Sequence, residues 1–300
     1  MDNELILFDR LNVIKDTINK YGEQNFYIGF SGGKDSTVVH HLVDMALPGN
    51  TIPRAFVNTG IEYIDIVKFV KGLASKDPRI EIVNAGVNIK QMLEKYGYPF
   101  KSKEHSTKLG QWQAANEAGR PQAEYTLNYW QGNETTKFKC PEILKYQFSE
   151  DFKLKVSPQC CVKMKKNTTH RFERERERTI LITGMQQSEG GQREHISCTV
   201  FRDGKMVKFH PLAKVNDEWE QWFIDKYNIQ LCKLYYDPYN FQRTGCKGCP
   251  FALNLQEELE VMEKYLPNER KQCEIIWKPV YDEYRRIGYR LKKDEQLKLF

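Results

Sequence analysis

The sequence FYIGFSGGKDS, residues 26–36, decides the fold of this chain. Its first five residues form an apolar run typical of a buried strand, and Thr37 to Leu47 continues with apolar residues at helical spacing. A strand that enters a Gly-rich turn and then a helix directs several backbone N–H groups, and the positive end of the helix dipole, at one point. The stretch therefore predicts a phosphate-binding site.

The residues of this turn suit such a site. Gly32 and Gly33 let the backbone approach a ligand closely, Lys34 adds positive charge, and Ser31 and Ser36 add hydroxyl donors. The turn differs from the Walker pattern, in which Gly-Lys-Ser/Thr follows a first glycine and four spacer residues. The alternative is an ordinary surface turn, which a six-residue string directly after a strand makes the weaker interpretation.

Beyond this turn, apolar strands alternate with helical patterns. Strands are predicted over residues 52–58, 80–83 and 179–183, and a helix over residues 61–73. A hairpin with an Asp-Gly turn is predicted over residues 196–209. The alternation indicates an α/β fold with a doubly wound parallel sheet, helices on both faces, and ligands at the carboxyl ends of the strands.

Two further loops are expected on the same edge of the sheet as the Gly-rich turn. Asn58-Thr59-Gly60 follows one strand, and the loop from Gly184 to Arg193 follows another. The second loop carries a carboxylate, Glu189, and a cation, Arg193, which we expect near bound phosphates or Mg²⁺. The alternative is that both side chains are simply exposed to solvent.

The cysteines indicate a second site. Eight cysteines in a cytosolic chain favour metal or redox use over disulfides, at least for the closely spaced Cys160-Cys161 and Cys246-Lys247-Gly248-Cys249. Four converging thiolates can hold a [4Fe–4S] cluster or a zinc ion. Because adjacent cysteines are awkward ligands for one tetrahedral ion, we expect the cluster. The alternative is four ordinary thiols, as we expect for the isolated Cys140, Cys198, Cys232 and Cys273.

Composition is ordinary for a soluble protein, with 40% hydrophobic and 29% charged residues. No apolar stretch approaches the roughly 18 residues needed to cross a membrane, and the first residues are acidic, so we expect a cytoplasmic protein. The net charge of +6 permits a nucleic-acid partner without requiring one. The mixed-charge run 171–178 is expected to form a solvated helix with Glu173–Arg176 and Glu175–Arg178 pairs.

Two domains are expected. Residues 1–215 would form the nucleotide-binding α/β domain, with an insertion or lid at about residues 101–158, where glycines, prolines and aromatic residues break the alternation. Residues 216–300 would form a helical C-terminal region that carries the Cys-x-x-Cys segment. Its helices are predicted to begin at Asp217 and at Leu255.

The order of these motifs resembles the phosphoadenosine phosphosulfate (PAPS) reductase family, in the PP-loop ATP pyrophosphatase superfamily. The matching segments are the Gly-rich turn, Asn58-Thr59-Gly60, Cys160-Cys161, the 184–193 loop, His210-Pro211-Leu212 and Arg243 to Pro250. The resemblance implies ATP or another adenine nucleotide, with Mg²⁺, and cleavage between the alpha and beta phosphates. We expect catalytic roles for Lys34, Asp35, Glu189 and Arg193, and nucleotide contacts from Ser31, Gly32, Gly33, Ser36, Asn58, Thr59, Gly60 and Gly184.

The paired cysteines are similar to those of the iron–sulfur sulfonucleotide reductases in this family, with one departure. Family members that reduce a sulfonucleotide carry a nucleophilic cysteine in a short C-terminal tail, whereas residues 292–300 contain none. The nearest cysteine, Cys273, falls in a segment patterned as a packed helix, and a buried thiol is a poor mobile nucleophile.

The leading hypothesis is therefore an enzyme that cleaves ATP to AMP and pyrophosphate, with Lys34 and Mg²⁺ stabilising the departing pyrophosphate, and adenylates an acceptor for sulfur transfer. It resembles the related proteins of DNA phosphorothioation, in which the acceptor is nucleic acid, and a cysteine desulfurase would be a suitable sulfur donor. The alternatives are a sulfonucleotide (APS or PAPS) reductase, which needs thioredoxin and releases sulfite, and a non-catalytic nucleotide-binding module.

Overall fold

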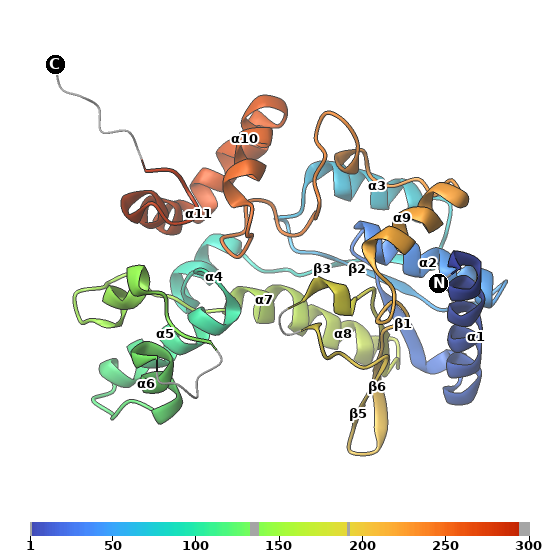
Figure 1. Ribbon diagram of the computed structural model, residues 1–300, viewed down its shortest axis with the longest axis horizontal. Helices are drawn as coiled ribbons and strands as arrows, with labels where there is room; N and C mark the ends of the chain where they lie inside the picture. The colour runs from blue at the N-terminus through green and yellow to red at the C-terminus, as the bar shows by residue number, and fades with distance from the viewer. Residues whose placement is uncertain (1, 133–137, 191–192, 294–300) are drawn as a thin grey trace. The chain divides into compact units, whose positions relative to one another are not determined.

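The computed structural model describes residues 2–132, 138–190 and 193–293, and the chain divides into two compact units (Figure 1). The sheet unit comprises Met1–Ala85 and Asn167–Gly245. The cysteine unit comprises Gly86–Lys166 and Cys246–Phe300. This division differs from the expected boundary after residue 215, because residues 216–245 group with the sheet and residues 246–300 group with the insertion.

Six strands form one sheet in the order β3-β2-β1-β4-β6-β5. Their bounds are β1 Phe26–Gly29, β2 Arg54–Asn58, β3 Ile80–Asn84, β4 Ile180–Ile182, β5 Thr199–Arg202 and β6 Lys205–Phe209. β1 pairs in parallel with β2 and with β4, and the β2–β3 and β4–β6 pairs are also parallel. β5 runs antiparallel to β6, as the predicted hairpin requires. The structure confirms the expected α/β fold.

Helices connect and cover these strands. The α-helices of the sheet unit are α1 Asn3–Tyr21, α2 Lys34–Ala46, α3 Ile64–Ala74, α8 Asn167–Glu175 and α9 Asp217–Lys226. Short 3-10 turns lie at η1 Glu23–Asn25, η4 Gln187–Glu189 and η6 Lys233–Tyr235. The helix predicted after the Gly-rich turn begins three residues earlier than its apolar pattern, because Gly33 is the N-cap and the polar residues from Lys34 onward form the first turn.

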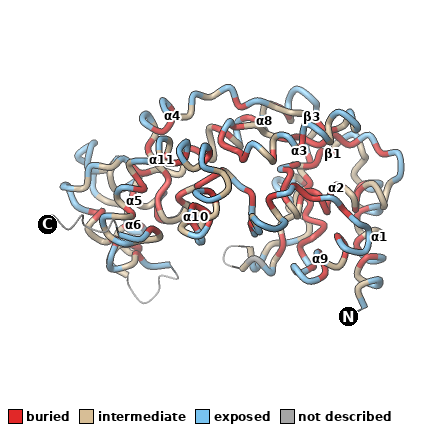
Figure 2. Tube along the Cα trace, turned by 90° about the horizontal axis from the view of Figure 1, so that it is seen from above, coloured by how far each residue is buried: buried red, intermediate tan, exposed pale blue. Residues whose placement is uncertain are grey.

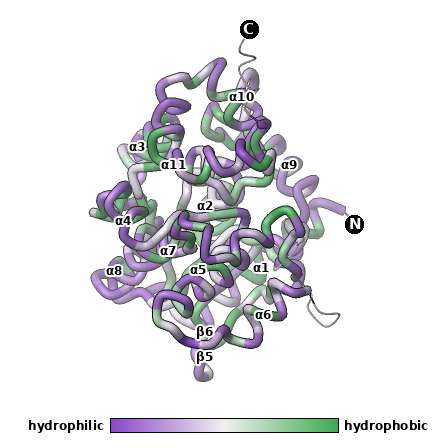
Figure 3. The backbone as a smooth tube through the Cα atoms, turned by 90° about the vertical axis from the view of Figure 1, so that its left-hand side faces the viewer, coloured by the Kyte–Doolittle hydropathy of each residue, from purple (hydrophilic) through white to green (hydrophobic). Residues whose placement is uncertain are grey.

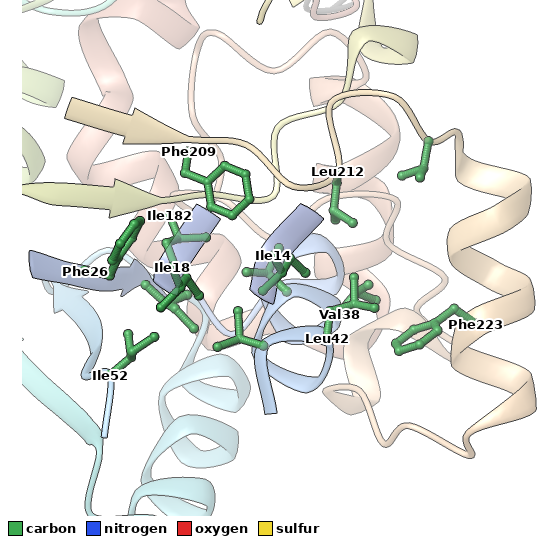
Figure 4. Packing of buried hydrophobic residues seen from close by; sticks show 14 of the residues in the cluster. Ile14, Ile18, Phe26, Val38, Leu42, Ile52, Ile182, Phe209, Leu212 and Phe223 are labelled. Atoms are coloured by element: carbon green, nitrogen blue, oxygen red, sulfur yellow. The ribbon is translucent and has the colours of Figure 1, made fainter. Parts of the chain in front are cut away.

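Side chains alternate along β1 between the two faces of the sheet. Phe26 and Ile28 belong to a core built with residues of α1, α2 and α9, among them Phe223 (Figure 4). Tyr27 points the other way and packs against Phe172 of α8, a helix that is otherwise hydrophilic (Figure 3). A strand covered by helices on both faces requires this alternation. β1 ends at Gly29, directly before the Gly-rich turn.

The charged run 171–178 forms different pairs from those predicted. Arg176 pairs with Glu81 of β3, and Arg171 pairs with Glu175. Glu173 accepts a hydrogen bond from the Tyr27 hydroxyl at 2.5 Å. The predicted pairing was wrong because α8 ends at Glu175, so the last arginines of the run lie beyond the helix.

The cysteine unit is helical. Its helices are α4 Ile89–Tyr96, α5 Lys103–Glu117, α6 Glu124–Gln131, η2 Glu142–Phe148, α7 Gln159–Cys161, the π-helical turn η3 Val162–Lys166, α10 Leu255–Tyr265 and α11 Pro267–Ile287. The inner face of α11 is buried at helical spacing through Cys273, Trp277, Tyr281 and Tyr284 (Figure 2). Within the described ranges, no helix has the length and apolar character needed to cross a membrane.

Candidate functional site

The Gly-rich turn joins the end of β1 to the start of α2, in the strand–turn–helix order that the sequence predicts. Gly32 has φ +70°, and a Cβ at that position would lie 2.6 Å from Val70 of α3. Gly32 therefore cannot be replaced without moving the loop or the helix beside it. Gly33 is extended and caps α2, which aims the first backbone N–H groups of the helix out of the turn.

Serine and threonine hydroxyls hold the turn in this shape. The hydroxyls of Ser36 and Thr37 both donate to the Gly33 carbonyl, at 3.0 and 2.9 Å. The Ser36 Oγ accepts from the Ser31 backbone N–H at 3.1 Å, and the Ser31 Oγ accepts from the Gly33 N–H at 3.2 Å. Ser36 is buried, whereas Ser31 is exposed. Ser36 is therefore part of the scaffold, and Ser31 is the hydroxyl that a ligand can approach.

Two hydroxyls from a distant segment complete the turn. The Lys34 backbone N–H donates to the Tyr235 hydroxyl at 3.0 Å, and that hydroxyl lies 2.6 Å from the Thr244 hydroxyl. Burial raises the pKa of Tyr235 to about 12, so the hydroxyl stays protonated. Tyr235 was not among the predicted site residues, since a tyrosine in a short 3-10 turn carries no local signal of this contact. It places a neutral oxygen against the N-terminus of α2, where an anion also binds well.

The Lys34 side chain contacts carboxylates of α9. Its Nζ lies 3.0 Å from an Oε of Glu220 and 3.8 Å from an Oδ of Asp217. The Glu220 side chain is fully buried. Burial, together with the negative charge of Asp35, raises the pKa of Glu220 to about 7 against the opposing effect of Lys34. The sequence signal was the acidic first turn of α9, which is also typical of any helix start.

The Asn58-Thr59-Gly60 turn at the end of β2 is closed by a buried carboxylate. Glu62 accepts hydrogen bonds from the backbone N–H of Thr59 at 2.9 Å and of Gly60 at 3.1 Å, and from the Thr59 hydroxyl at 2.7 Å. The Asn58 amide bonds with Asn84 of β3 at 3.1 Å. Glu62 was not predicted, and it satisfies amides of this turn that were expected to meet the nucleotide.

The loop after β4 lies directly against the Gly-rich turn. A Cβ at Gly184 would lie 2.7 Å from the Cβ of Asp35 and 2.8 Å from its carbonyl oxygen. The close approach requires glycine at this position and brings the two loops together. The side chain of Glu189 lies outside the described residues. Arg193 is half-buried. The pKa of His210 is lowered to about 4, first by burial and then by the positive charges of Lys208 and Arg193.

All four paired cysteines lie in the cysteine unit. The Cys160 and Cys161 sulfurs on α7 are 4.0 Å apart. The pKa of Cys160 is raised by its hydrogen bond to Cys161, by burial, and by the nearby thiols of Cys249 and Cys246. The same hydrogen bond holds the pKa of Cys161 below its usual value, aided by nearby lysines at positions 103, 165 and 166. The electrostatic coupling indicates that the two pairs converge.

The Cys-x-x-Cys turn is fixed to α11. The Cys249 N–H donates to the Cys246 carbonyl at 3.2 Å, which closes the turn. Trp277 donates to the Lys247 carbonyl at 3.1 Å, Tyr281 to the Gly248 carbonyl, and Tyr284 to the Pro250 carbonyl at 2.8 Å. Three side chains from one face of a single helix therefore hold three carbonyls of the turn.

Gly248 of this turn packs directly against Cys273 of α11. Gly248 has φ +58°, and a Cβ there would lie 2.7 Å from the Cys273 sulfur. Cys273 is fully buried in α11, and burial raises the pKa of its thiol to about 12. It has the packed position that its sequence pattern predicts. A thiol so placed is neither ionised nor mobile.

The donor set was compared with the needs of a single zinc ion. Four sulfurs at about 2.3 Å from one tetrahedral zinc would lie about 3.8 Å from one another. Among the described residues, the three metal-type ligand atoms within 4.8 Å of one another belong to His40, Asp44 and Asp77, so no three of the four cysteine sulfurs meet that spacing. The Cys160 and Cys161 sulfurs, 4.0 Å apart, are close to the zinc spacing, but no third sulfur of the described set joins them within 4.8 Å.

The His40, Asp44 and Asp77 group is an ion-pair network. Arg54 donates to His40 at 3.1 Å and to Asp44 at 2.6 Å. Arg79 donates to Asp44 at 2.8 Å and to Asp77 at 2.8 Å. Two guanidinium groups already take the lone pairs that a metal ion would need, so the group serves the fold.

Comparisons with known proteins place this geometry in context. The family model of the phosphoadenosine phosphosulfate reductase domain matches residues 25–252. An uncharacterized protein of Methanocaldococcus jannaschii is 25% identical over 279 residues, which cover 91% of this chain and 53% of the relative. The chain thus spans about half the length of this curated relative.

Three solved structures are similar at low identity. The phosphate complex of a PAPS reductase from Candida auris has a TM-score of 0.42 at 12% identity, over 79% of this chain and 93% of that chain. An NH3-dependent NAD synthetase from Campylobacter jejuni has a TM-score of 0.43 at 13% identity, over 94% and 96%. The ATP complex of Candida glabrata FMN adenylyltransferase has a TM-score of 0.44 at 12% identity, over 80% and 61%.

Proposed function

This chain belongs to the phosphoadenosine phosphosulfate reductase domain family, and we propose that it is an enzyme that binds ATP at the Gly-rich turn and adenylates an acceptor for sulfur transfer. The observation that carries this proposal is the turn between β1 and α2, whose shape depends on Gly32 and on the contact between Asp35 and Gly184. Such a turn offers backbone N–H groups and a helix N-terminus to phosphate oxygens.

The reaction needs no covalent help from the protein. An acceptor oxygen attacks the alpha phosphorus of ATP, the bond from that phosphorus to the bridging oxygen breaks, and pyrophosphate leaves with the electron pair. The exposed Ser31 hydroxyl and the N-terminus of α2 orient the phosphates. Asp35, in the first turn of α2, is the carboxylate we assign to Mg²⁺, which neutralises charge on the leaving pyrophosphate. A persulfide sulfur, supplied by a donor such as a cysteine desulfurase, then attacks the adenylated atom and displaces AMP. A thiol reductant cleaves the resulting S–S bond, which leaves the sulfur on the acceptor and a disulfide as the oxidised product.

The cysteine unit is the proposed site of a [4Fe–4S] cluster held by Cys160, Cys161, Cys246 and Cys249. The coupling of the four thiols supports this assignment, as does the turn that presents Cys246 and Cys249. Such a cluster supplies one-electron chemistry, or a stable cross-link between the two cysteine pairs.

For the acceptor we propose nucleic acid. Residues 86–166 hold 14 lysines and arginines against 8 aspartates and glutamates, an excess equal to the net charge of the whole chain. Lys103 and Lys166 are exposed and act on Cys161 electrostatically. Basic side chains concentrated in one unit favour a phosphate backbone as partner.

The test is the product formed by pure protein prepared without oxygen. With ATP, Mg²⁺ and single-stranded DNA or RNA, we expect pyrophosphate and AMP, and α,β-methylene-ATP should bind without being cleaved. Sulfite released from a sulfonucleotide, with no pyrophosphate from ATP, would instead support the reductase. Nucleotide binding without either product would support the non-catalytic module. The burial of Cys273 and its raised pKa make this thiol a poor nucleophile for the release of sulfite.

A further inference from the structure

We propose that Glu220 is a positioning residue of the nucleotide site: its buried carboxylate holds the Lys34 ammonium against α9, and phosphate recognition is left to the N-terminus of α2 and the Ser31 hydroxyl. This inference rests on the proposed function, since it concerns the same site. It assigns to the Lys34 side chain a different role from direct contact with the leaving pyrophosphate.

The geometry separates the two ends of Lys34. Its backbone N–H belongs to the turn and donates to Tyr235, whereas its Nζ lies 3.0 Å from Glu220. The Lys34 side chain is 19% exposed and that of Glu220 is not exposed at all. The lysine therefore spans from the phosphate loop to a neighbouring helix and ties the two together.

The surroundings of Glu220 make this contact difficult to give up. Its neighbours in the sequence of α9, Trp219 and Phe223, are part of the hydrophobic core. If Lys34 turned toward a phosphate, Glu220 would lose the positive charge that opposes the rise of its pKa, which is already about 7, and its carboxyl would take up a proton. Release of Lys34 therefore costs the ion pair and requires protonation of Glu220. A phosphate would instead meet the N-terminus of α2, whose dipole attracts anions.

The Lys34–Glu220 pair also helps to hold the first turn of α9 beside the start of α2. Residues 216–226 cover the core beside α2, and the first turn of α9 faces the start of α2 through Lys34. Loss of one partner alone should therefore displace the loop, and loss of both should not. This non-additivity separates a positioning role from a ligand role.

The experiment measures affinity for α,β-methylene-ATP with Mg²⁺, and for AMP, by calorimetry in wild type, Lys34→Met and Lys34→Met/Glu220→Gln. We expect Lys34→Met to weaken both nucleotides by the same factor, about tenfold, because the whole loop moves. The double variant should return to within about threefold of wild type. The matched control is Lys226→Met, which removes a lysine of α9 that pairs with Glu4 of α1 and should change neither affinity.

Two outcomes would overturn the proposal. If Lys34→Met weakened ATP binding but not AMP binding, or if the double variant bound as poorly as the single one, Lys34 would be a phosphate ligand. If Lys34→Met bound both nucleotides like wild type, the ion pair would have no positioning role. If the double variant fails to fold, the affinities of Lys34→Met for the ATP analogue and for AMP still distinguish a positioning role from a ligand role. Absence of nucleotide binding by wild type would contradict the proposed function itself, which is a distinct result.

Discussion

In the sheet unit, residues 31–36 are held by small hydroxyl side chains and by the clearance that Gly32 and Gly184 provide. In the cysteine unit, residues 246–250 are held by three large aromatic side chains of α11. The first loop keeps an exposed hydroxyl and a helix N-terminus for a ligand that arrives and leaves. The second is packed from behind, which suits a group that stays. The difference agrees with the two proposals, an exchangeable nucleotide in the sheet unit and a resident cluster in the cysteine unit.

The largest expected effect is the loss of the proposed cluster while nucleotide binding stays unchanged. Protein prepared without oxygen should be brown with about four irons per chain. Cys246→Ser should lose iron and colour completely, because a hydroxyl replaces one of four thiolate ligands. ATP affinity should stay within about twofold, since the phosphate loop belongs to the sheet unit. Metal analysis and calorimetry on the same sample measure both.

Cys140→Ser is the matched control, because Cys140 is a buried thiol of the same unit outside the paired cysteines. It should keep its iron. Stoichiometric zinc without iron in wild type would contradict the cluster and leave a structural zinc site.

The next largest effect is a loss of nucleotide affinity. Gly184→Ala would place a Cβ 2.7 Å from the Cβ of Asp35, so one of the two loops must shift. We expect nucleotide affinity to fall about 10- to 100-fold, as a displacement of about 1 Å in a preorganised site can cause. Iron content should not change.

Gly72→Ala offers the matched glycine control. Gly72 lies within α3, has ordinary helical backbone, and has nothing within 4 Å of an added Cβ. The substitution should leave affinity unchanged and raise stability by up to about 1 kcal/mol, because alanine favours helix over glycine. Equal affinity in Gly184→Ala and wild type would show that the contact with Asp35 does not shape the site.

A smaller effect tests the proposed acceptor. Lys103→Gln/Lys166→Gln should lower the affinity for single-stranded nucleic acid about tenfold at low salt. It should also reduce the slope of log affinity against log salt by about 1.4. Fluorescence anisotropy across a salt series measures both. Lys278→Gln/Lys292→Gln, two exposed lysines of the same unit, should change less. Equal effects of the two pairs would indicate binding by overall charge rather than at the cysteine site.

The smallest effect concerns Cys273. Cys273→Ala removes one buried sulfur behind Gly248 and should cost about 1 kcal/mol of unfolding free energy, with activity retained. Thermal unfolding and the pyrophosphate assay measure the two quantities. Sulfite release that disappears with this substitution would restore the reductase, because an attacking thiolate has no substitute.

The sequence was sufficient for the features whose signals are local. The continuous apolar run of β1, the glycines at positions 32 and 33, and the helical pattern that begins at Thr37 all lie within a few residues of one another. Those patterns predicted the parallel sheet and the Gly-rich turn between β1 and α2, which the structure contains. The burial of Cys273 also followed from its helical spacing.

The partners of that loop could not be predicted, because they come from elsewhere in the chain. Tyr235 and Glu220 are separated from Lys34 by about two hundred residues, and neither carries a motif. Glu62 is close in sequence to Thr59, but a glutamate after a turn is common and gives no sign that it will be buried. The grouping of residues 246–300 with the insertion likewise depends on packing between segments rather than on composition.

The attachment of the Cys-x-x-Cys turn to α11 bears on how a metal centre is assembled. Zinc fingers fold only when the ion arrives, so the ion supplies the energy that orders the chain. Here the carbonyls of Lys247, Gly248 and Pro250 already have protein donors, and Arg290 adds a second bond to Pro250 at 2.7 Å. Hydrogen bonds from protein side chains therefore order this turn together with the proposed cluster, so the cluster would not be the sole source of its fold.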